Sequence, residues 1–173
     1  MDPQKKSVPV LNGEELYVPF VGAIIENENA DQKQILIQVR QKASDKVYDG
    51  SYEIPGGKFS AFEDIYESLR REVKEESGLT LSFITGEKER IDCPNRGQTS
   101  TLIDPFCVTQ TKEGPFIGII FLCKAAGTPL QLTNETKEAR WIEVTELKKI
   151  VGETPELFYT PFLAPLKKYL GII

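Results

Sequence analysis

The stretch REVKEESGL, from Arg71 to Leu79, places three glutamates at the end of a predicted helix. Gly78 suits the left-handed position that follows a helix, and Leu79 supplies the apolar contact that often accompanies it. The C-terminus of a helix carries the negative end of the backbone dipole, so each exposed carboxylate there costs roughly 0.3–1 kcal/mol. Three carboxylates in this position therefore need a compensating interaction.

Upstream of this stretch, the sequence predicts that the helix begins at Ala61 and continues to Ser77. Ser60 and Glu63 have the spacing of a capping box, which satisfies N–H groups at a helix start. Four apolar side chains follow at helical spacing and form one stripe that faces the core: Phe62, Ile65, Leu69 and Val73.

The three glutamates can converge on one point. At about 100° per residue, Glu72, Glu75 and Glu76 fall within one arc of about 100° beside the apolar stripe. Carboxylates at this spacing repel one another unless a cation lies between them, and Mg²⁺ prefers oxygen ligands of this kind. The alternative is a solvated helix face, on which Arg71 forms i,i+4 ion pairs with Glu67 and Glu75. The helix by itself leaves both interpretations open.

Length and charge narrow the class of protein. The 173 residues suit a single domain, residues 1–173, which needs no disulfide or metal in order to fold. The 21 basic residues are interspersed with 26 acidic ones, for a net charge of −5, so no nucleic-acid partner is expected. The segment MDPQKKSVPVLNGEEL lacks the apolar core of a signal peptide, and the longest apolar run is too short to span a bilayer. We therefore expect a cytoplasmic protein with no membrane partner.

Cysteine and histidine usage limits the chemistry. Cys93, Cys107 and Cys123 are widely separated, which favours buried reduced thiols over a disulfide framework or a zinc site. The chain contains no histidine, which excludes Ser-His-Asp and Cys-His catalysis and any His-ligated metal. The chemistry must use carboxylates, lysine, tyrosine or a metal ion held by oxygen.

Runs of β-branched residues and turn signals predict a mixed α+β domain. The predicted strands are Val18–Glu26, Ile35–Arg40, Tyr52–Ile54, Thr80–Ile91, Phe106–Gln110, Phe116–Ala125 and Arg140–Val144. The first two are expected to pair, the two strands around KEGP to form a second hairpin, and Cys93–Pro105 to be a loop. Two short helices are predicted near Glu146–Val151 and Glu156–Leu170, the second interrupted by Pro161 and Pro165.

From Gly57 to Leu79 the sequence GKFSAFEDIYESLRREVKEESGL matches the pattern G-x5-E-x7-R-E-U-x-E-E-x-G-U at every position, where U is a bulky aliphatic residue. This pattern is the Nudix box, and its seven fixed identities would coincide by chance about once in 10⁸ starting points. The flanks also resemble the Nudix hydrolase family, with a strand pair and YEIPGG before the box and a strand ending in Trp141 after it. The resemblance implies an α/β/α sandwich with a central mixed β-sheet.

The resemblance also implies a site. Transferred by matching position, the ligands of Mg²⁺ or Mn²⁺ would be the carbonyl of Gly57 and the carboxylates of Glu72, Glu75 and Glu76. Arg71 would orient a box carboxylate, and Glu63 would be mainly structural. The metal would then compensate the unfavourable charge at the helix end, because its charge exceeds the half-charge of the dipole.

The implied reaction is hydrolysis of a nucleoside diphosphate linked to another moiety. Metal ions would neutralise the pyrophosphate and lower the pKa of a bound water, and a carboxylate would remove the proton of that water. Glu72 is one candidate for this base. Glu135, six residues before Trp141, resembles a downstream glutamate that binds metal or acts as base in some relatives, and Glu138 is the reserve candidate. A solvated loop acid is the alternative interpretation of Glu135.

The substrate is less well defined by the sequence. Pro94 follows Leu79 by fifteen residues, as a proline does in some ADP-ribose-cleaving relatives, which favours ADP-ribose or another nucleotide sugar. The alternatives are a nucleoside triphosphate, cleaved to the monophosphate and pyrophosphate, and a non-catalytic nucleotide-sensing module. Homodimers are frequent in the family, and the sequence leaves the oligomeric state open.

Other polar and aromatic residues are candidates for substrate contacts. Arg40 and Arg96 could contact phosphate, although Arg40 at a predicted strand end also fits an ordinary surface position. Tyr17, Phe20 and Phe106 could stack on a base, but aromatic residues in and around strands more often belong to the core.

Overall fold

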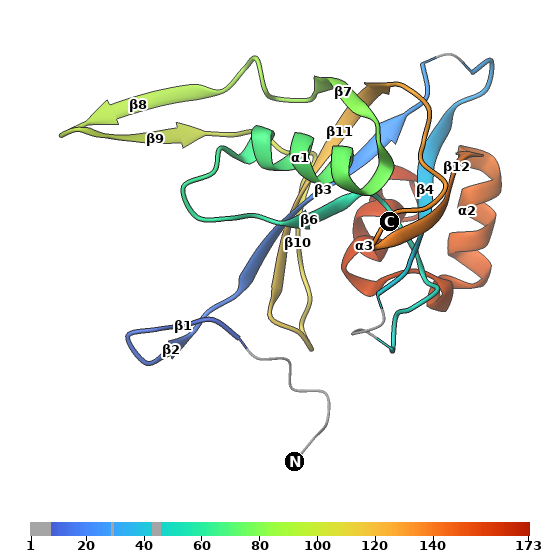
Figure 1. Cartoon of the computed structure of the whole chain (residues 1–173), viewed down its shortest axis with the longest axis horizontal. Helices are drawn as coiled ribbons and strands as arrows, with labels where there is room; N and C mark the ends of the chain where they lie inside the picture. The colour runs from blue at the N-terminus through green and yellow to red at the C-terminus, as the bar shows by residue number, and fades with distance from the viewer. Residues whose placement is uncertain (1–7, 29, 43–45) are drawn as a thin grey trace.

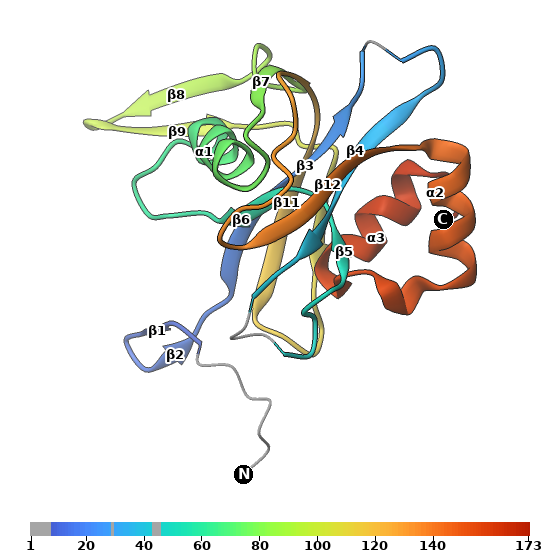
Figure 2. The same cartoon turned by 45° about the vertical axis from the view of Figure 1, so that its right-hand side comes forward.

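The central element of the fold is a mixed β-sheet of eight strands, covered by helix α1 on one face and by helices α2 and α3 on the other (Figure 1, Figure 2). The description covers residues 8–28, 30–42 and 46–173 of a computed structural model. The first seven residues of the segment examined for a signal peptide lie outside it, as does residue 29 between the first two predicted strands. The arrangement confirms the predicted α/β/α sandwich.

The helices are α1 (Ile65–Ser77), α2 (Val144–Glu153) and α3 (Thr160–Tyr169), with a 3₁₀ turn, η1 (Pro155–Leu157), before α3. The strands are β1 (Val10–Leu11), β2 (Glu14–Glu15), β3 (Val18–Glu26), β4 (Gln34–Arg40), β5 (Tyr52–Glu53), β6 (Gly56–Lys58), β7 (Thr80–Ile84), β8 (Ile91–Asn95), β9 (Gln98–Leu102), β10 (Cys107–Gln110), β11 (Phe116–Ala126) and β12 (Thr136–Glu143). In the part of the chain described above, no helix is long and apolar enough to cross a membrane.

The main sheet has the strand order β10-β11-β3-β4-β12, with β5, β6 and β7 paired to β4, β3 and β11. Strands β11 and β3 are parallel, and the remaining pairs of the sheet are antiparallel. The predicted pairing of the first two strands and the predicted hairpin around KEGP are both confirmed, as β3 with β4 and β10 with β11.

Strand β3 shows why the sheet is buried on both faces. Successive side chains of a strand point to opposite faces. Phe20 and Ile24 pack in the cluster that includes α2 and α3, whereas Val21, Ala23 and Ile25 pack in the cluster that includes α1. A strand covered on both faces is apolar along its whole length, which is why this segment has no polar alternation.

Helix α1 begins later than the sequence predicts. Its N-cap is Asp64, whose carboxylate accepts hydrogen bonds from the N–H groups of Tyr66 and Glu67 at 3.0 and 3.3 Å. The predicted capping box of Ser60 and Glu63 is therefore wrong. Asp64 and Glu67 have the same three-residue spacing, and aspartate is as good an N-cap residue as serine. Phe62 precedes the helix and is fully exposed, so it is not part of the apolar stripe.

The end of α1 agrees with the prediction. Gly78 has φ +73° and its N–H donates to the carbonyl of Lys74 at 3.0 Å, and Leu79 is fully buried. A Cβ on Gly78 would lie 2.5 Å from Cγ of Leu130. Only glycine combines this backbone conformation with this close approach, so the segment that contains Leu130 can pack directly against the helix end.

The region after α1 differs from the prediction. Strand β7 ends at Ile84, and the predicted loop is an antiparallel hairpin, β8 with β9, that projects from the body of the molecule (Figure 1). Positive φ angles at Arg96 (+50°) and Gly97 (+77°) give the two-residue turn that matches strand twist. Short exposed strands have no buried face, so alternation could not reveal them.

Three further predictions need correction. Strand β12 begins at Thr136 rather than Arg140, because a register irregularity between Lys137 and Arg140 interrupts its pattern. The predicted last helix is divided into η1 and α3, and Pro161 lies in the first turn of α3, where a proline is tolerated. The three cysteines are free thiols, but only Cys123 is buried: Cys107 is half-buried and Cys93 is exposed.

Candidate active site

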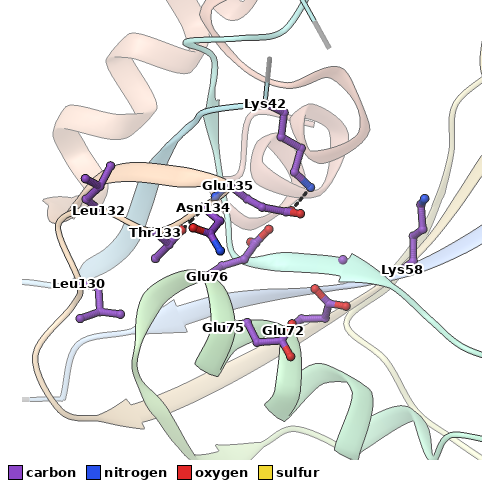
Figure 3. A pocket seen from close by; sticks show the side chains of 11 residues that line it. Lys42, Lys58, Glu72, Glu75, Glu76, Leu130, Leu132, Thr133, Asn134 and Glu135 are labelled. Atoms are coloured by element: carbon purple, nitrogen blue, oxygen red, sulfur yellow. Dashed lines mark hydrogen bonds and ion pairs between the residues drawn. The ribbon is translucent and has the colours of Figure 1, made fainter. Parts of the chain in front are cut away.

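A cavity of about 590 Å³ opens beside the C-terminal half of α1 (Figure 3). Its lining combines four acids with two lysines and a short polar and apolar segment: Lys42, Gly57, Lys58, Glu72, Glu75, Glu76, Leu130, Leu132, Thr133, Asn134 and Glu135. Four parts of the chain line the cavity: the residues just after β4, strand β6, helix α1 and the segment before β12. The structure thus brings together every residue that the sequence proposed as a metal ligand.

Glu76 is the most buried acid of the cavity, at 4% exposure. Its Oε2 atom accepts hydrogen bonds from Nε2 of Gln38 at 2.8 Å and from the backbone N–H of Gly56 at 3.0 Å. Burial raises the pKa of Glu76 to about 8, and the nearby carboxylate of Glu53 acts in the same direction. These contacts fix the carboxylate at the base of the cavity.

Glu53 is a second buried acid, which the sequence analysis did not identify. It is 1% exposed, and its Oε2 atom accepts from Nη1 of Arg40 at 3.1 Å. Burial raises the pKa of Glu53 to about 7, although Arg40 opposes the shift. The interpretation of Arg40 as a surface residue is therefore wrong: it is 9% exposed and its guanidinium lies 4.3 Å from the ring centroid of Tyr159.

The raised pKa of Glu53 predicts that the free energy of unfolding depends on pH when no divalent ion is present. The pKa of Glu53 rises from 4.5 to about 7 in the folded protein, so the folded form binds more protons than the unfolded chain between these pH values. The stability that protonation contributes is present below pH 4.5 and is lost as the pH rises through about 7. Urea unfolding across this interval should show that the free energy of unfolding declines less in Glu53→Gln than in wild type. Identical pH profiles of the two proteins would contradict the raised pKa of Glu53.

Arg71 connects the acids of the box. Its Nε and Nη2 atoms donate to the two carboxylate oxygens of Glu63 at 2.9 and 3.1 Å, and its Nη1 donates to Glu72 at 2.6 Å and to Glu75 at 3.4 Å. Glu63 thus holds Arg71 rather than capping the helix. Burial raises the pKa of Glu72 and Arg71 opposes that shift. Arg71 therefore contacts Glu63 and Glu72 at the same time.

Glu135 reaches the cavity from the side opposite α1 (Figure 3). Its carboxylate forms an ion pair with Lys42, and about half of its side chain is exposed. The reserve candidate, Glu138, does not line the cavity; it has φ +53° and its exposed carboxylate pairs with Lys137. Lys42 and Lys58 were missed because single lysines next to strands carry no distinguishing pattern.

The remaining candidates for substrate contacts lie elsewhere. Arg96 is at the tip of the β8–β9 hairpin and Pro94 is within β8. Phe20 is a core residue, Phe106 packs against the same core, and Tyr17 is half-exposed. They are absent from the cavity lining.

The donor set fits a hard divalent cation, since it consists of carboxylates and a backbone carbonyl. Three of these carboxylates contact another side chain of the protein: Glu72 contacts Arg71, Glu76 contacts Gln38 and Glu135 contacts Lys42. Accordingly, no group of three or more acidic or thiol side chains among the described residues is already arranged around a single ion position. Each of these contacts uses one carboxylate oxygen, namely Oε1 of Glu72, Oε2 of Glu76 and Oε2 of Glu135, so the second oxygen of each side chain is the one that would meet a metal ion.

Replacing Gly57 with alanine tests the packing at the cavity. A Cβ at this position would overlap the carboxylate of Glu72, which is the flexible end of its side chain. We expect Gly57→Ala to fold with a melting temperature close to that of wild type, yet to lose about 10²-fold in kcat/KM because the carboxylate of Glu72 is displaced from its position in the cavity. Thermal unfolding and steady-state kinetics check both parts. Unchanged kinetics would show that the position of Glu72 is unimportant.

Comparison with known proteins gives consistent similarities. A family model described as NUDIX domain matches residues 16–160. The chain is 28% identical over 130 residues to an ADP-ribose pyrophosphatase of Methanocaldococcus jannaschii; the match covers 75% of this chain and 64% of the length of that relative.

Solved structures show the same fold. A NUDIX hydrolase from Nitrosomonas europaea is similar with a TM-score of 0.65 at 19% identity, over 91% of this chain and 72% of that one. A MutT protein from Methanosarcina mazei Go1 is similar with a TM-score of 0.59 at 23% identity, over 90% of this chain and 94% of that one.

Proposed function

The chain belongs to the NUDIX domain family, and from this premise we propose that it hydrolyses the pyrophosphate bond of a nucleoside diphosphate linked to another moiety, with a divalent metal ion as cofactor. The observation that carries the proposal is the meeting of Glu72, Glu75, Glu76 and Glu135 with Gly57 at one cavity. Acids of like charge gathered at a helix C-terminus are unfavourable without a cation, and a divalent ion removes that cost.

Each part of the site has a role in this proposal. The carboxylates of α1, the carbonyl of Gly57 and the carboxylate of Glu135 would hold Mg²⁺ or Mn²⁺. A bound ion would supply positive charge for the pyrophosphate and acidify water. Lys42 and Lys58, which line the same cavity, supply positive charge for phosphate oxygens. Arg71 keeps the carboxylate of Glu72 directed as it is.

The proton of the attacking water requires a carboxylate within hydrogen-bond reach. Glu72 and Glu135 both line the cavity, so both are candidates for this base. Glu76 is less suited, because two donors already fix its Oε2 atom. Because both residues are also placed as metal ligands, kcat at saturating metal is compared together with Mn²⁺ affinity in Glu72→Gln and Glu135→Gln. The base is the residue whose substitution lowers kcat while Mn²⁺ affinity changes least.

ADP-ribose is the substrate that we favour. The support is the similarity to an ADP-ribose pyrophosphatase, although the chain spans 64% of the length of that relative. The net charge of −5 argues for a small-molecule partner rather than nucleic acid. The three free cysteines are consistent with a cytoplasmic location.

The proposal is tested by incubating the full chain with ADP-ribose, other sugar nucleotides, dinucleoside polyphosphates and nucleoside triphosphates, with Mg²⁺ or with a chelator. Separation of the products identifies which anhydride bond is cleaved. We expect a nucleoside monophosphate and a sugar phosphate, only when Mg²⁺ is present. Release of pyrophosphate from triphosphates alone would move the activity to that substrate class, and no release from any compound would contradict the proposal.

A further inference from the structure

The segment before β12 is attached to the end of helix α1. The N–H of Leu130 donates to the carbonyl of Ser77 at 2.8 Å, and the hydroxyl of Thr136 donates to the carbonyl of Glu76 at 2.8 Å. The last four carbonyls of a helix have no partner within the helix. This segment therefore provides hydrogen-bond donors for two carbonyls at the helix end that carries the cavity glutamates. Thr136 and Glu76 are 60 residues apart in the sequence.

The turn that carries Glu135 has a fixed internal structure. The Thr133 hydroxyl accepts from the N–H groups of Glu135 at 3.2 Å and of Thr136 at 3.0 Å. The two threonine hydroxyls are 2.9 Å apart, and because Thr136 gives its only hydroxyl hydrogen to Glu76, Thr133 is the donor between them. The N–H of Thr133 also donates to the carbonyl of Thr136 at 2.8 Å. The backbone of Glu135 is thereby fixed relative to Thr136.

Thr136 belongs to the turn and also contacts the helix end. The residue is 1% exposed and is absent from the cavity lining, so it contacts neither solvent nor the space for substrate. The carboxylate of Glu76 is held separately, by Gln38 and Gly56. Loss of the Thr136 hydroxyl would leave that carboxylate in place, together with the bond from Leu130 to Ser77 and the bond from the N–H of Gln41 to the carbonyl of Glu135 at 2.6 Å. It would remove the one hydrogen bond that joins the backbone of Glu76 directly to the turn of Glu135 among the residues described.

We propose that Thr136 is a positioning residue of the site, whose hydroxyl sets the separation between the helix end with Glu75 and Glu76 and the turn with Glu135. The inference rests on the proposed function, because it concerns carboxylates that hold a metal ion from two sides. Residues that orient metal ligands without touching the metal typically change metal affinity or activity by about 10–100-fold when substituted.

Valine at position 136 removes the hydroxyl while it keeps the shape of threonine, and serine restores the hydroxyl. Thr154→Val is the matched control, since the Thr154 hydroxyl donates to the carbonyl of Ile150 at 3.0 Å at the end of α2, which carries no residue of the cavity lining. The measurements are Mn²⁺ binding to the full chain, followed by electron paramagnetic resonance of the free ion, urea unfolding, and kcat and KM with ADP-ribose.

We expect Thr136→Val to bind Mn²⁺ about tenfold more weakly or worse, with a fall in kcat rather than a rise in KM. Thr136→Ser should bind as wild type does, and Thr154→Val should lose stability without a change in Mn²⁺ affinity. If Thr136→Val does not fold, Thr133→Val, which removes the hydroxyl that binds the N–H groups of Glu135 and Thr136, is expected to weaken Mn²⁺ binding, and Thr133→Ser, which keeps a hydroxyl in the cavity lining, to restore it. Wild-type Mn²⁺ affinity in Thr133→Val would overturn the positioning role.

The outcomes separate this inference from the proposed function. Wild-type affinity for Mn²⁺ in Thr136→Val, or a serine variant as weak as the valine variant, would overturn the positioning role alone. A wild-type chain that binds no Mn²⁺ would overturn the proposed function together with it.

Discussion

Glu76→Gln is expected to lower the rate of substrate hydrolysis by about 10³-fold or more at saturating Mg²⁺, since a metal ion supplies several kcal/mol of transition-state stabilisation. Glu76 is the acid that the fold holds most firmly, through Gln38 and the N–H of Gly56. An amide oxygen at this position can keep both hydrogen bonds, but it has no charge with which to bind a divalent cation. The loss is therefore chemical rather than structural.

Stability should change in the opposite direction. Burial raises the pKa of Glu76 to about 8, so the ionised carboxylate is unfavourable in the folded protein. A neutral glutamine avoids this cost, and we expect Glu76→Gln without Mg²⁺ to be at least as stable as wild type above that pH. A variant that is inactive and well folded can be recognised by urea unfolding together with kinetics.

Glu67→Gln is the matched control for this substitution. Glu67 lies on the same helix, is largely exposed, pairs with Arg70 and does not line the cavity. Its substitution should leave both Mg²⁺ dependence and turnover unchanged. Turnover by Glu76→Gln at the level of this control would refute the assignment of Glu76 as a metal ligand.

Arg40→Met is expected to lower the free energy of unfolding by about 3 kcal/mol or more, the usual cost of removing one partner from a buried ion pair. Nη1 of Arg40 donates to Glu53 at 3.1 Å, and both side chains are nearly inaccessible to solvent. Without the guanidinium, the carboxylate of Glu53 must either remain charged in the interior or take up a proton. The guanidinium contact with the ring of Tyr159 is lost as well.

The double variant Arg40→Met, Glu53→Leu distinguishes a charge effect from a packing effect. Replacing both members of a buried pair with apolar residues is often nearly neutral, so at least about half of the lost stability should return. Urea unfolding of the single and double variants provides the comparison. A double variant that is less stable than Arg40→Met would contradict the charge explanation.

The helix of the Nudix box could be predicted because its spacing and its end are determined by residues that are close together in the sequence. Glu72, Glu75 and Glu76 follow from helical spacing, and Gly78 follows from the demands of a helix end, where φ is +73° in the structure. The start of the helix was predicted wrongly because Asp64 can cap as well as Ser60, and only the contact between Glu63 and Arg71 decides between them.

The residues that hold the site glutamates in position could not be predicted, because their contacts depend on how segments far apart in the sequence pair with one another. Gln38 lies opposite Glu53 in the pairing of β4 with β5, and this alignment places an amide and a second acid beside Glu76. Thr136 reaches the end of α1 only through the path of the segment before β12. Alternation of apolar residues in one strand carries no information on which polar residue of another strand will lie beside it.

The proposed metal-dependent hydrolysis is tested most directly by the conversion of ADP-ribose by the purified wild-type chain, with Mg²⁺ and with the metal removed by a chelator, followed by chromatographic separation of the products. We expect AMP and ribose 5-phosphate in equal amounts with Mg²⁺, and neither product after chelation. Product formation at the same rate in both conditions would contradict the metal site proposed for the four glutamates.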